Sequence, residues 1–257
     1  MDDKLTAFKQ LLQTMNTLRE ECPWDRKQTF ESLRPHTVEE VYELSDAVLK
    51  KDDQKIMEEL GDLLLHVVFY ARIGEEKDSF DIKSICDFLV EKLIKRHPHI
   101  YGNTKVNDEH DVKDNWEKIK AANGLKSTLG GVPLSLPSMI KAIRIQEKAR
   151  GVGFDWDNKG QVWDKVQEEL EEFNNAVTEP DCCRESIEDE FGDVLFSLIN
   201  YARFFDINPD TALEKTNLKF MDRFNRMETR IKGEGKAFRE MSLVEMEEYW
   251  QQSKTGH

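Results

Sequence analysis

Apolar residues recur at helical spacing along most of the chain. The first such run is made of Leu5, Phe8, Leu11, Leu12, Met15 and Leu18. Residues three and four positions apart share one face of an α-helix, so this spacing predicts an amphipathic helix. The same spacing recurs at Val162, Val166, Leu170 and Phe173. No segment shows the strict alternation with β-branched residues that is typical of a strand. The pattern therefore predicts an all-α fold of helical bundles.

Two segments are apolar around most of their circumference. They are residues 60–72, LGDLLLHVVFYAR, and residues 191–203, FGDVLFSLINYAR. A helix of this kind has to be covered on more than one side. We expect each segment to be buried between other helices or across a dimer interface.

The two segments belong to an internal repeat. In the first copy PWD precedes TVEEVYELSDAV and MEELGDLLLHVVFYAR, and in the second copy FDWD precedes KVQEELEEFNNAV and EDEFGDVLFSLINYARFF. Between the copies, residues 121–137 are rich in Gly, Pro and Ser, which is typical of a linker. We therefore predict two similar domains, residues 1–120 and 138–257, joined by this linker. Trp24 and Trp156 of the repeated WD element are expected to close the core of each domain.

Composition narrows the class of protein. The 257 residues are 39% hydrophobic and 34% charged, with few Gly and Pro, which favours helices. A formal net charge of -14 disfavours nucleic acid as a partner, because binding phosphates directly needs clustered Lys and Arg. The four cysteines have no zinc-type spacing, the N-terminus has no secretory pattern, and no apolar run approaches the roughly 20 residues of a membrane span. We expect a soluble cytoplasmic protein with no membrane partner.

Paired carboxylates are the candidate chemistry. The second copy has Glu169, Glu172, Glu190 and Asp193, and the first has Glu40, Glu43, Glu59 and Asp62. Within each pair the spacing is three residues, so both members project from one helix face. Two such helices packed antiparallel would bring four carboxylates together, and these would repel one another unless cations intervened. A single EExxE is usually a solvated face, but its pairing and repetition favour a metal site for Mg²⁺.

At these residues the sequence resembles the MazG family of nucleoside triphosphate pyrophosphohydrolases, within the all-α pyrophosphohydrolase superfamily. The most specific motifs are CPWDRKQTF, EEVYE with EELGDLL, RHPH, GFDW, EELEE and EFGDVLF. The resemblance implies tandem MazG domains, a homodimer, and dependence on Mg²⁺, for which Mn²⁺ could substitute. It also implies hydrolysis of ribo- and deoxyribonucleoside triphosphates to the monophosphate and pyrophosphate, with broad specificity.

The resemblance also assigns residues. In the second domain it implies that Glu169, Glu172, Glu190 and Asp193 are the catalytic metal ligands. It further implies that Lys219 and Arg223 contact phosphates and that Trp250 contacts the nucleobase. We expect attack by water on the α-phosphorus, with Glu169 as the proton acceptor.

Comparison of the two copies indicates which domain is active. Aligning the repeats places Asn200 opposite Phe69 and Asn217 opposite Val90. An inward-facing amide needs hydrogen-bond partners, in the core or on a ligand, and we expect both amides to bind substrate. The C-terminal domain should then carry most of the activity.

Other interpretations stay open. His97 and His99, in RHPH, are more simply a chain turn at a proline than catalytic groups. A phosphatase with similar ligands would instead release orthophosphate. A non-catalytic nucleotide-binding regulator or scaffold of a stress-response system would bind without turnover.

Overall fold

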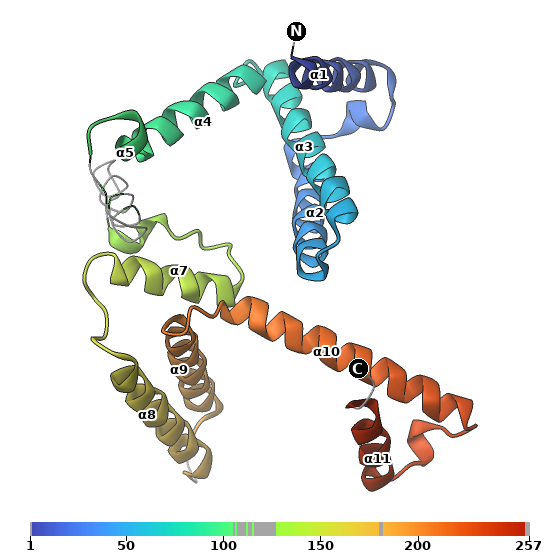
Figure 1. The fold of residues 1–257 in the computed structure, drawn as a ribbon, viewed down its shortest axis with the longest axis vertical. Helices are drawn as coiled ribbons and strands as arrows, with labels where there is room; N and C mark the ends of the chain where they lie inside the picture. The colour runs from blue at the N-terminus through green and yellow to red at the C-terminus, as the bar shows by residue number, and fades with distance from the viewer. Residues whose placement is uncertain are drawn as a thin grey trace. The chain divides into compact units, whose positions relative to one another are not determined.

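The computed structural model describes residues 2–104, 106, 112, 115, 127–179 and 182–254. All regular structure in these ranges is helical, as predicted (Figure 1). The chain divides into two compact units, Met1–Val112 and Lys113–His257. The predicted linker 121–137 therefore falls in the second unit, and its described part contains the 3-10 turn η2, Thr128–Gly131, which packs on helix α7.

The first unit contains five described α-helices and one 3-10 turn. They are α1 (Asp3–Glu21), η1 (Asp25–Lys27), α2 (Phe30–Lys50), α3 (Asp53–Glu76), α4 (Ile82–Arg96) and α5 (Pro98–Tyr101). Helices α2 and α3 form a hairpin, which α1 joins by packing on α3. His97 lies between α4 and Pro98 of α5, so the predicted chain turn at RHPH is confirmed.

The second unit repeats the hairpin and adds a long helix. After η2 come α7 (Ser138–Arg150), α8 (Lys159–Thr178), α9 (Arg184–Arg203), α10 (Pro209–Gly233), η3 (Phe238–Glu240) and α11 (Leu243–Lys254). Helices α8 and α9 pack side by side, α7 packs on α9, and α11 folds back on α10 (Figure 1). The order of helix then hairpin is the same in both units.

Local sequence signals set the ends of the hairpin helices. Helix α2 begins with a capping box in which Thr29 and Ser32 exchange hydrogen bonds, and it ends at Lys51 with φ of 56°. Asp52 then caps α3 by accepting from the Lys55 amide at 3.1 Å. Asn158 caps α8 in the same way. Because these caps satisfy amides that have no partner within the first turn, they stabilise the beginnings of the helices that carry the carboxylates.

The core of the first unit lies where α1 meets the hairpin. It consists of Met15, Leu33, Val68, Phe69 and Ile73, all less than 4% exposed. An ion pair of 2.9 Å between Arg19 and Glu76 also joins α1 to α3. The expectation that Trp24 closes this core is wrong, because its side chain is 57% exposed and the neighbouring Asp25 is buried instead.

Each apolar segment keeps an exposed apolar face among the described residues. Leu60, Leu64 and Val67 of α3 are exposed, and so are Leu195, Phe196 and Leu198 of α9. No described helix covers these faces, although the sequence pattern predicts a cover. No helix among the described residues has the length and apolar character needed to cross a membrane.

Candidate active site

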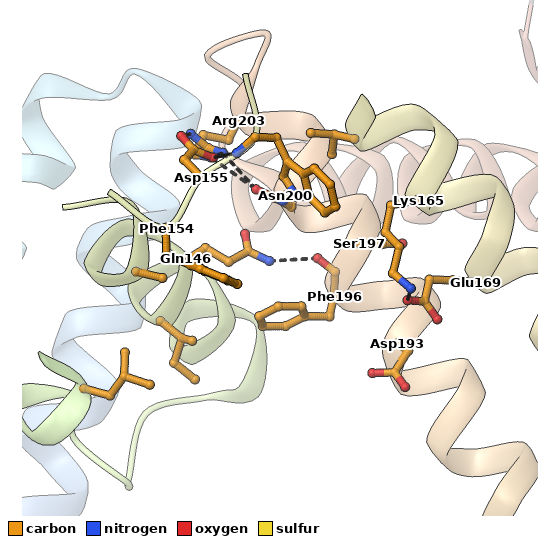
Figure 2. Close-up of a pocket in the computed structure, with 15 residues that line it drawn as sticks. Gln146, Phe154, Asp155, Lys165, Glu169, Asp193, Phe196, Ser197, Asn200 and Arg203 are labelled. Atoms are coloured by element: carbon orange, nitrogen blue, oxygen red, sulfur yellow. Dashed lines mark hydrogen bonds and ion pairs between the residues drawn. The ribbon is translucent and has the colours of Figure 1, made fainter. Parts of the chain in front are cut away.

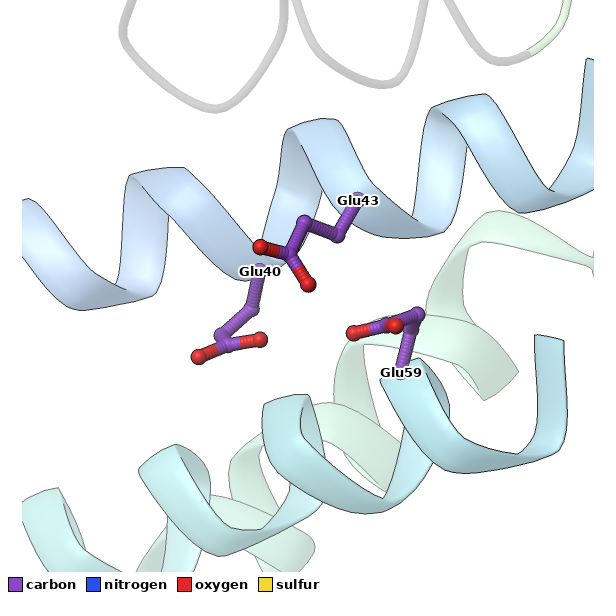
Figure 3. Close-up of side chains that lie close together, drawn as sticks. All are labelled: Glu40, Glu43 and Glu59. Carbon is purple, nitrogen blue, oxygen red and sulfur yellow. The ribbon is translucent and has the colours of Figure 1, made fainter. Parts of the chain in front are cut away.

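Three carboxylates meet across the hairpin of the first unit. Glu40 and Glu43 of α2 and Glu59 of α3 have oxygens within 4.8 Å of one another (Figure 3). Desolvation raises the pKa of Glu40, and the charges of Asp62, Glu43 and Glu59 raise it further. Asp62 therefore lies near this cluster, although it is outside the group of three.

The second unit builds a matching cluster. Glu169 of α8 meets Glu190 and Asp193 of α9, with oxygens again within 4.8 Å of one another. Glu172 is outside this group of three. Its pKa is raised by desolvation and by the nearby charges of Glu169 and Glu190, so it too lies close. The structure thus brings three of the four predicted carboxylates together in each unit and places the fourth beside them.

Next to each cluster lies a lysine that the carboxylate pattern did not predict. Lys55 lies 2.8 Å from Glu59 Oε1, and Lys165 lies 2.8 Å from Glu169 Oε1. Hydrogen bonds with Glu59 and Glu58 raise the pKa of Lys55, and those with Glu168 and Glu169 raise the pKa of Lys165. The signal was in the sequence, because a lysine four residues before a glutamate shares its helix face. Each lysine offsets part of the crowded negative charge.

Glu59 shows that this compensation is incomplete. The residue is 1% exposed, and its Oε1 faces the Lys55 ammonium at 2.8 Å. One ammonium does not balance the three carboxylates of the cluster. Carboxylates this close repel one another, and a divalent cation would relieve the repulsion.

A cavity of about 510 Å³ opens beside the second cluster (Figure 2). Glu169, Asp193 and Lys165 line one part of it. Aliphatic and aromatic side chains line most of the rest: Leu129, Ile145, Ala149, Val162, Phe154, Trp156 and Phe196. The polar side chains among them are Gln146, Ser197, Asn200, Asp155 and Arg203. The volume is in the range of small-molecule sites, and the lining combines apolar walls with few polar groups, as such sites do.

Asn200 is the one predicted substrate-binding residue that lines this cavity. Its Oδ1 accepts hydrogen bonds from Arg203, at 3.0 Å from Nη2 and 3.3 Å from Nε. Arg203 is itself held by Asp155, with 2.9 Å between Nη1 and Oδ2. The amide is therefore held in one orientation at the cavity wall.

The other predicted substrate-binding residues lie on α10 and α11. Asn217 is exposed and donates to Glu214 Oε2 at 3.1 Å, so the structure does not place it on an inward face. Lys219 is exposed, and Arg223 and Trp250 are half-buried. Trp250 packs against Phe220, with 5.0 Å between ring centroids. None of these four lines the cavity.

The same region of the first unit is filled by side chains. Phe69, opposite Asn200 in the repeat, is 3% exposed and packs in the core with Met15. His66, opposite Ser197, is buried and hydrogen-bonded through Nδ1 to the Thr37 hydroxyl at 2.8 Å. Burial lowers the pKa of His66. This part of the first unit is core.

The fold and the clusters define a class: an all-α protein whose paired helices bear carboxylates suited to divalent cations. Residues 28–101 match the family described as the MazG nucleotide pyrophosphohydrolase domain. The chain is 42% identical to the nucleoside triphosphate pyrophosphohydrolase/pyrophosphatase MazG of Thermotoga maritima, over 97% of this chain and 96% of that protein. It is 39% identical to the nucleoside triphosphate pyrophosphohydrolase of Escherichia coli K12, over 97% of this chain and 98% of that protein. The chain belongs to the MazG family of nucleotide pyrophosphohydrolases.

Proposed function

We propose that this enzyme hydrolyses nucleoside triphosphates to the monophosphate and pyrophosphate, and that the second unit carries most of the activity. The observation that carries this proposal is the cavity whose wall includes Glu169 and Asp193 of the second cluster. The names of the two full-length relatives support the substrate class. Both ribo- and deoxyribonucleotides are proposed substrates, and the cytoplasm remains the proposed location.

The carboxylate clusters fit a hard divalent cation. Their donors are all carboxylate oxygens, which Mg²⁺ prefers and Mn²⁺ accepts. Glu169, Glu190 and Asp193 would hold the ion, with Glu172 beside them, and Glu40, Glu43, Glu59 and Asp62 would do so in the first unit. The burial of Glu59 within a cluster of three carboxylates supports this fit. When bound, the ion would offset phosphate charge and make a nearby water more acidic.

Side chains of the second unit would handle protons and phosphates. Glu169 is the proposed proton acceptor. Glu172, which lies beside the cluster of three, is the alternative, because Glu169 is also paired with Lys165. Lys165 lines the cavity and can donate charge-assisted hydrogen bonds to a phosphate. On the family resemblance alone, Lys219 and Arg223 are proposed to hold the β- and γ-phosphates. Trp250, which lies outside the cavity, is the alternative contact for the base.

A homodimer would cover the exposed apolar faces. Leu195 and Leu198 of α9, and Leu64 and Val67 of α3, are exposed in the single chain. Burying such residues against a second copy would be favourable by about 25 cal/mol for each Å² removed from water. We therefore propose that the active form is a dimer, which sedimentation equilibrium tests by the mass of the particle.

The first unit favours a different role. It keeps a carboxylate cluster, but Met15 and Phe69 occupy the region that is a cavity in the second unit. This supports the proposal that the first unit contributes little to turnover.

Product identity tests the proposed reaction. Each common ribo- and deoxyribonucleoside triphosphate is incubated with the full chain and Mg²⁺, and the products are separated by ion-exchange chromatography. Monophosphate and pyrophosphate in equal amounts are expected. Diphosphate and orthophosphate would identify a phosphatase, and binding without products would identify a regulator.

A further inference from the structure

We propose that Gln146 and Asn200 form a pair that reads the nucleobase, with Gln146 as the acceptor and Asn200 as the donor. The proposal rests on the proposed function, because it assigns the base of the nucleotide to the cavity of the second unit. Both side chains line this cavity from different helices, Gln146 from α7 and Asn200 from α9 (Figure 2).

The orientation of Gln146 is fixed by a backbone carbonyl. Its Nε2 donates to the Phe196 carbonyl oxygen at 2.8 Å, and the side chain is only 9% exposed. Turning the amide over would place two acceptor oxygens against each other, which is unfavourable. No described residue donates to Gln146 Oε1. Gln146 therefore offers an acceptor to a ligand.

The guanidinium of Arg203 fixes the orientation of Asn200 so that this amide presents a donor, whereas Gln146 presents an acceptor. Arg203 donates to Oδ1 through Nη2 and Nε, and a guanidinium has no acceptor that could satisfy a turned amide. The ion pair with Asp155 keeps Arg203 in place. No described residue accepts from Asn200 Nδ2. Asn200 therefore offers a donor to a ligand.

The apolar lining suits a flat ring between these two amides. Phe154, Trp156 and Phe196 line the cavity, and aromatic side chains stack on the face of any base. Because stacking does not depend on which base is bound, any discrimination between bases has to come from the two amides.

One acceptor and one donor match every common base. Adenine offers N6–H and N1, guanine N1–H and O6, cytosine N4–H and N3, and uracil N3–H and O4, in each case a donor next to an acceptor. The donor and acceptor stand in one order on adenine and cytosine and in the reverse order on guanine and uracil, so bases of the two kinds would enter with opposite faces of the ring turned to the aromatic walls. In these two orientations the pair admits all four bases and requires an intact donor and acceptor on the edge they use to pair in nucleic acids. Broad specificity for normal bases and discrimination against bases blocked at that edge are both expected.

Methylated uridine triphosphates test this proposal. A methyl group at N3 removes the donor that Gln146 would read, whereas a methyl group at C5 leaves the edge intact. For the full chain with Mg²⁺, we expect kcat/KM to fall on the order of 10-fold from UTP to 3-methyl-UTP, as for one lost hydrogen bond to a buried group. For 5-methyl-UTP we expect a change of less than about 3-fold.

The variant Gln146→Met supplies the matched control, since it removes the acceptor at similar length. It should lower kcat/KM for UTP and shrink the penalty for 3-methyl-UTP. If this variant does not fold, the two methylated substrates still decide the question in the natural chain. Equal kcat/KM for UTP and 3-methyl-UTP would overturn the base-reading pair while leaving the proposed function standing. Failure to hydrolyse any nucleoside triphosphate would overturn the proposed function as well.

Discussion

The two units share a hairpin with three clustered carboxylates but differ in what lies beside it. In the first unit Met15 and Phe69 fill the space between the preceding helix and the hairpin. In the second unit Gln146 and Asn200 line a cavity there. Gln146 follows Met15 by the same number of residues as Asn200 follows Phe69. Among the described residues, both units therefore have a carboxylate cluster, whereas the cavity beside it is seen in the second unit.

The difference has a simple energetic reason. Filling a space with Met and Phe gains apolar burial and dispersion contacts, which stabilises the unit. Lining it with amides gives up part of that stability and leaves polar atoms that a ligand can satisfy. The core of the first unit therefore gains stability at the positions where the second unit keeps polar atoms at a cavity.

The largest expected effect comes from the matched pair Glu190→Gln and Glu59→Gln. Glu190→Gln removes a charged ligand beside the cavity and should lower kcat/KM for ATP at least ~100-fold, or about 2.7 kcal/mol. Glu59→Gln, its counterpart in the first unit, should leave kcat/KM within about 3-fold. Steady-state assays of pyrophosphate release measure both. Equal losses of kcat/KM in the two variants would contradict the proposal that the second unit carries most of the activity.

Met15→Ala tests the filled core of the first unit. Met15 is 1% exposed, so its truncation leaves a void and should lower the free energy of unfolding by about 2–5 kcal/mol. Met57→Ala, at a position that is 60% exposed on α3, is the control and should change it by less than about 0.5 kcal/mol. Urea denaturation followed by circular dichroism measures both values. Similar values for the two variants would contradict the assigned core.

Magnesium should stabilise the protein through its clusters. At a concentration about 100 times the dissociation constant, binding to one site adds about 2.7 kcal/mol to the free energy of unfolding. The rise in Tm is measured by calorimetry against NaCl of equal ionic strength. Glu59→Gln and Glu190→Gln should each remove part of it. A full rise in both variants would show that the ion binds elsewhere.

Lowering the pH should reduce the rise in Tm that Mg²⁺ produces, and this is the smallest of the expected effects. The pKa of Glu40 and of Glu172 is raised above the ordinary value of 4.5. Without the ion, their contribution to stability is therefore fully present below pH 4.5 and is lost as the pH rises through the raised pKa. Protons and cations relieve the same repulsion, so the Tm gain from Mg²⁺ should be larger at pH 7 than near pH 5. An equal gain at both values would contradict competition between them.

Much of the fold was predictable from local patterns. Apolar spacing predicted the helices, and the repeat predicted that each half contains a hairpin with paired acidic residues. The clusters followed from this, because residues three apart share a helix face whatever surrounds them. Lys55 and Lys165 could have been predicted by the same rule, from their spacing to Glu59 and Glu169.

The cavity was not predictable in this way. Asn200 was singled out by comparing the repeats, but Gln146 and Asp155 come from segments whose packing no local pattern describes. Asn217 was expected to face inward on similar grounds, yet α10 exposes it and Glu214 accepts its hydrogen bond. An amide in a helix has the same sequence signature whether it faces a ligand, the core or solvent.

By itself, the sequence determined the helices, the repeat and the pairing of carboxylates, because these depend on periodicity within a few turns. Only the tertiary structure decided which three carboxylates of each four converge, which apolar faces stay uncovered, and where a cavity remains. Those outcomes depend on distances between segments far apart in the chain, and such distances are set by how whole helices pack.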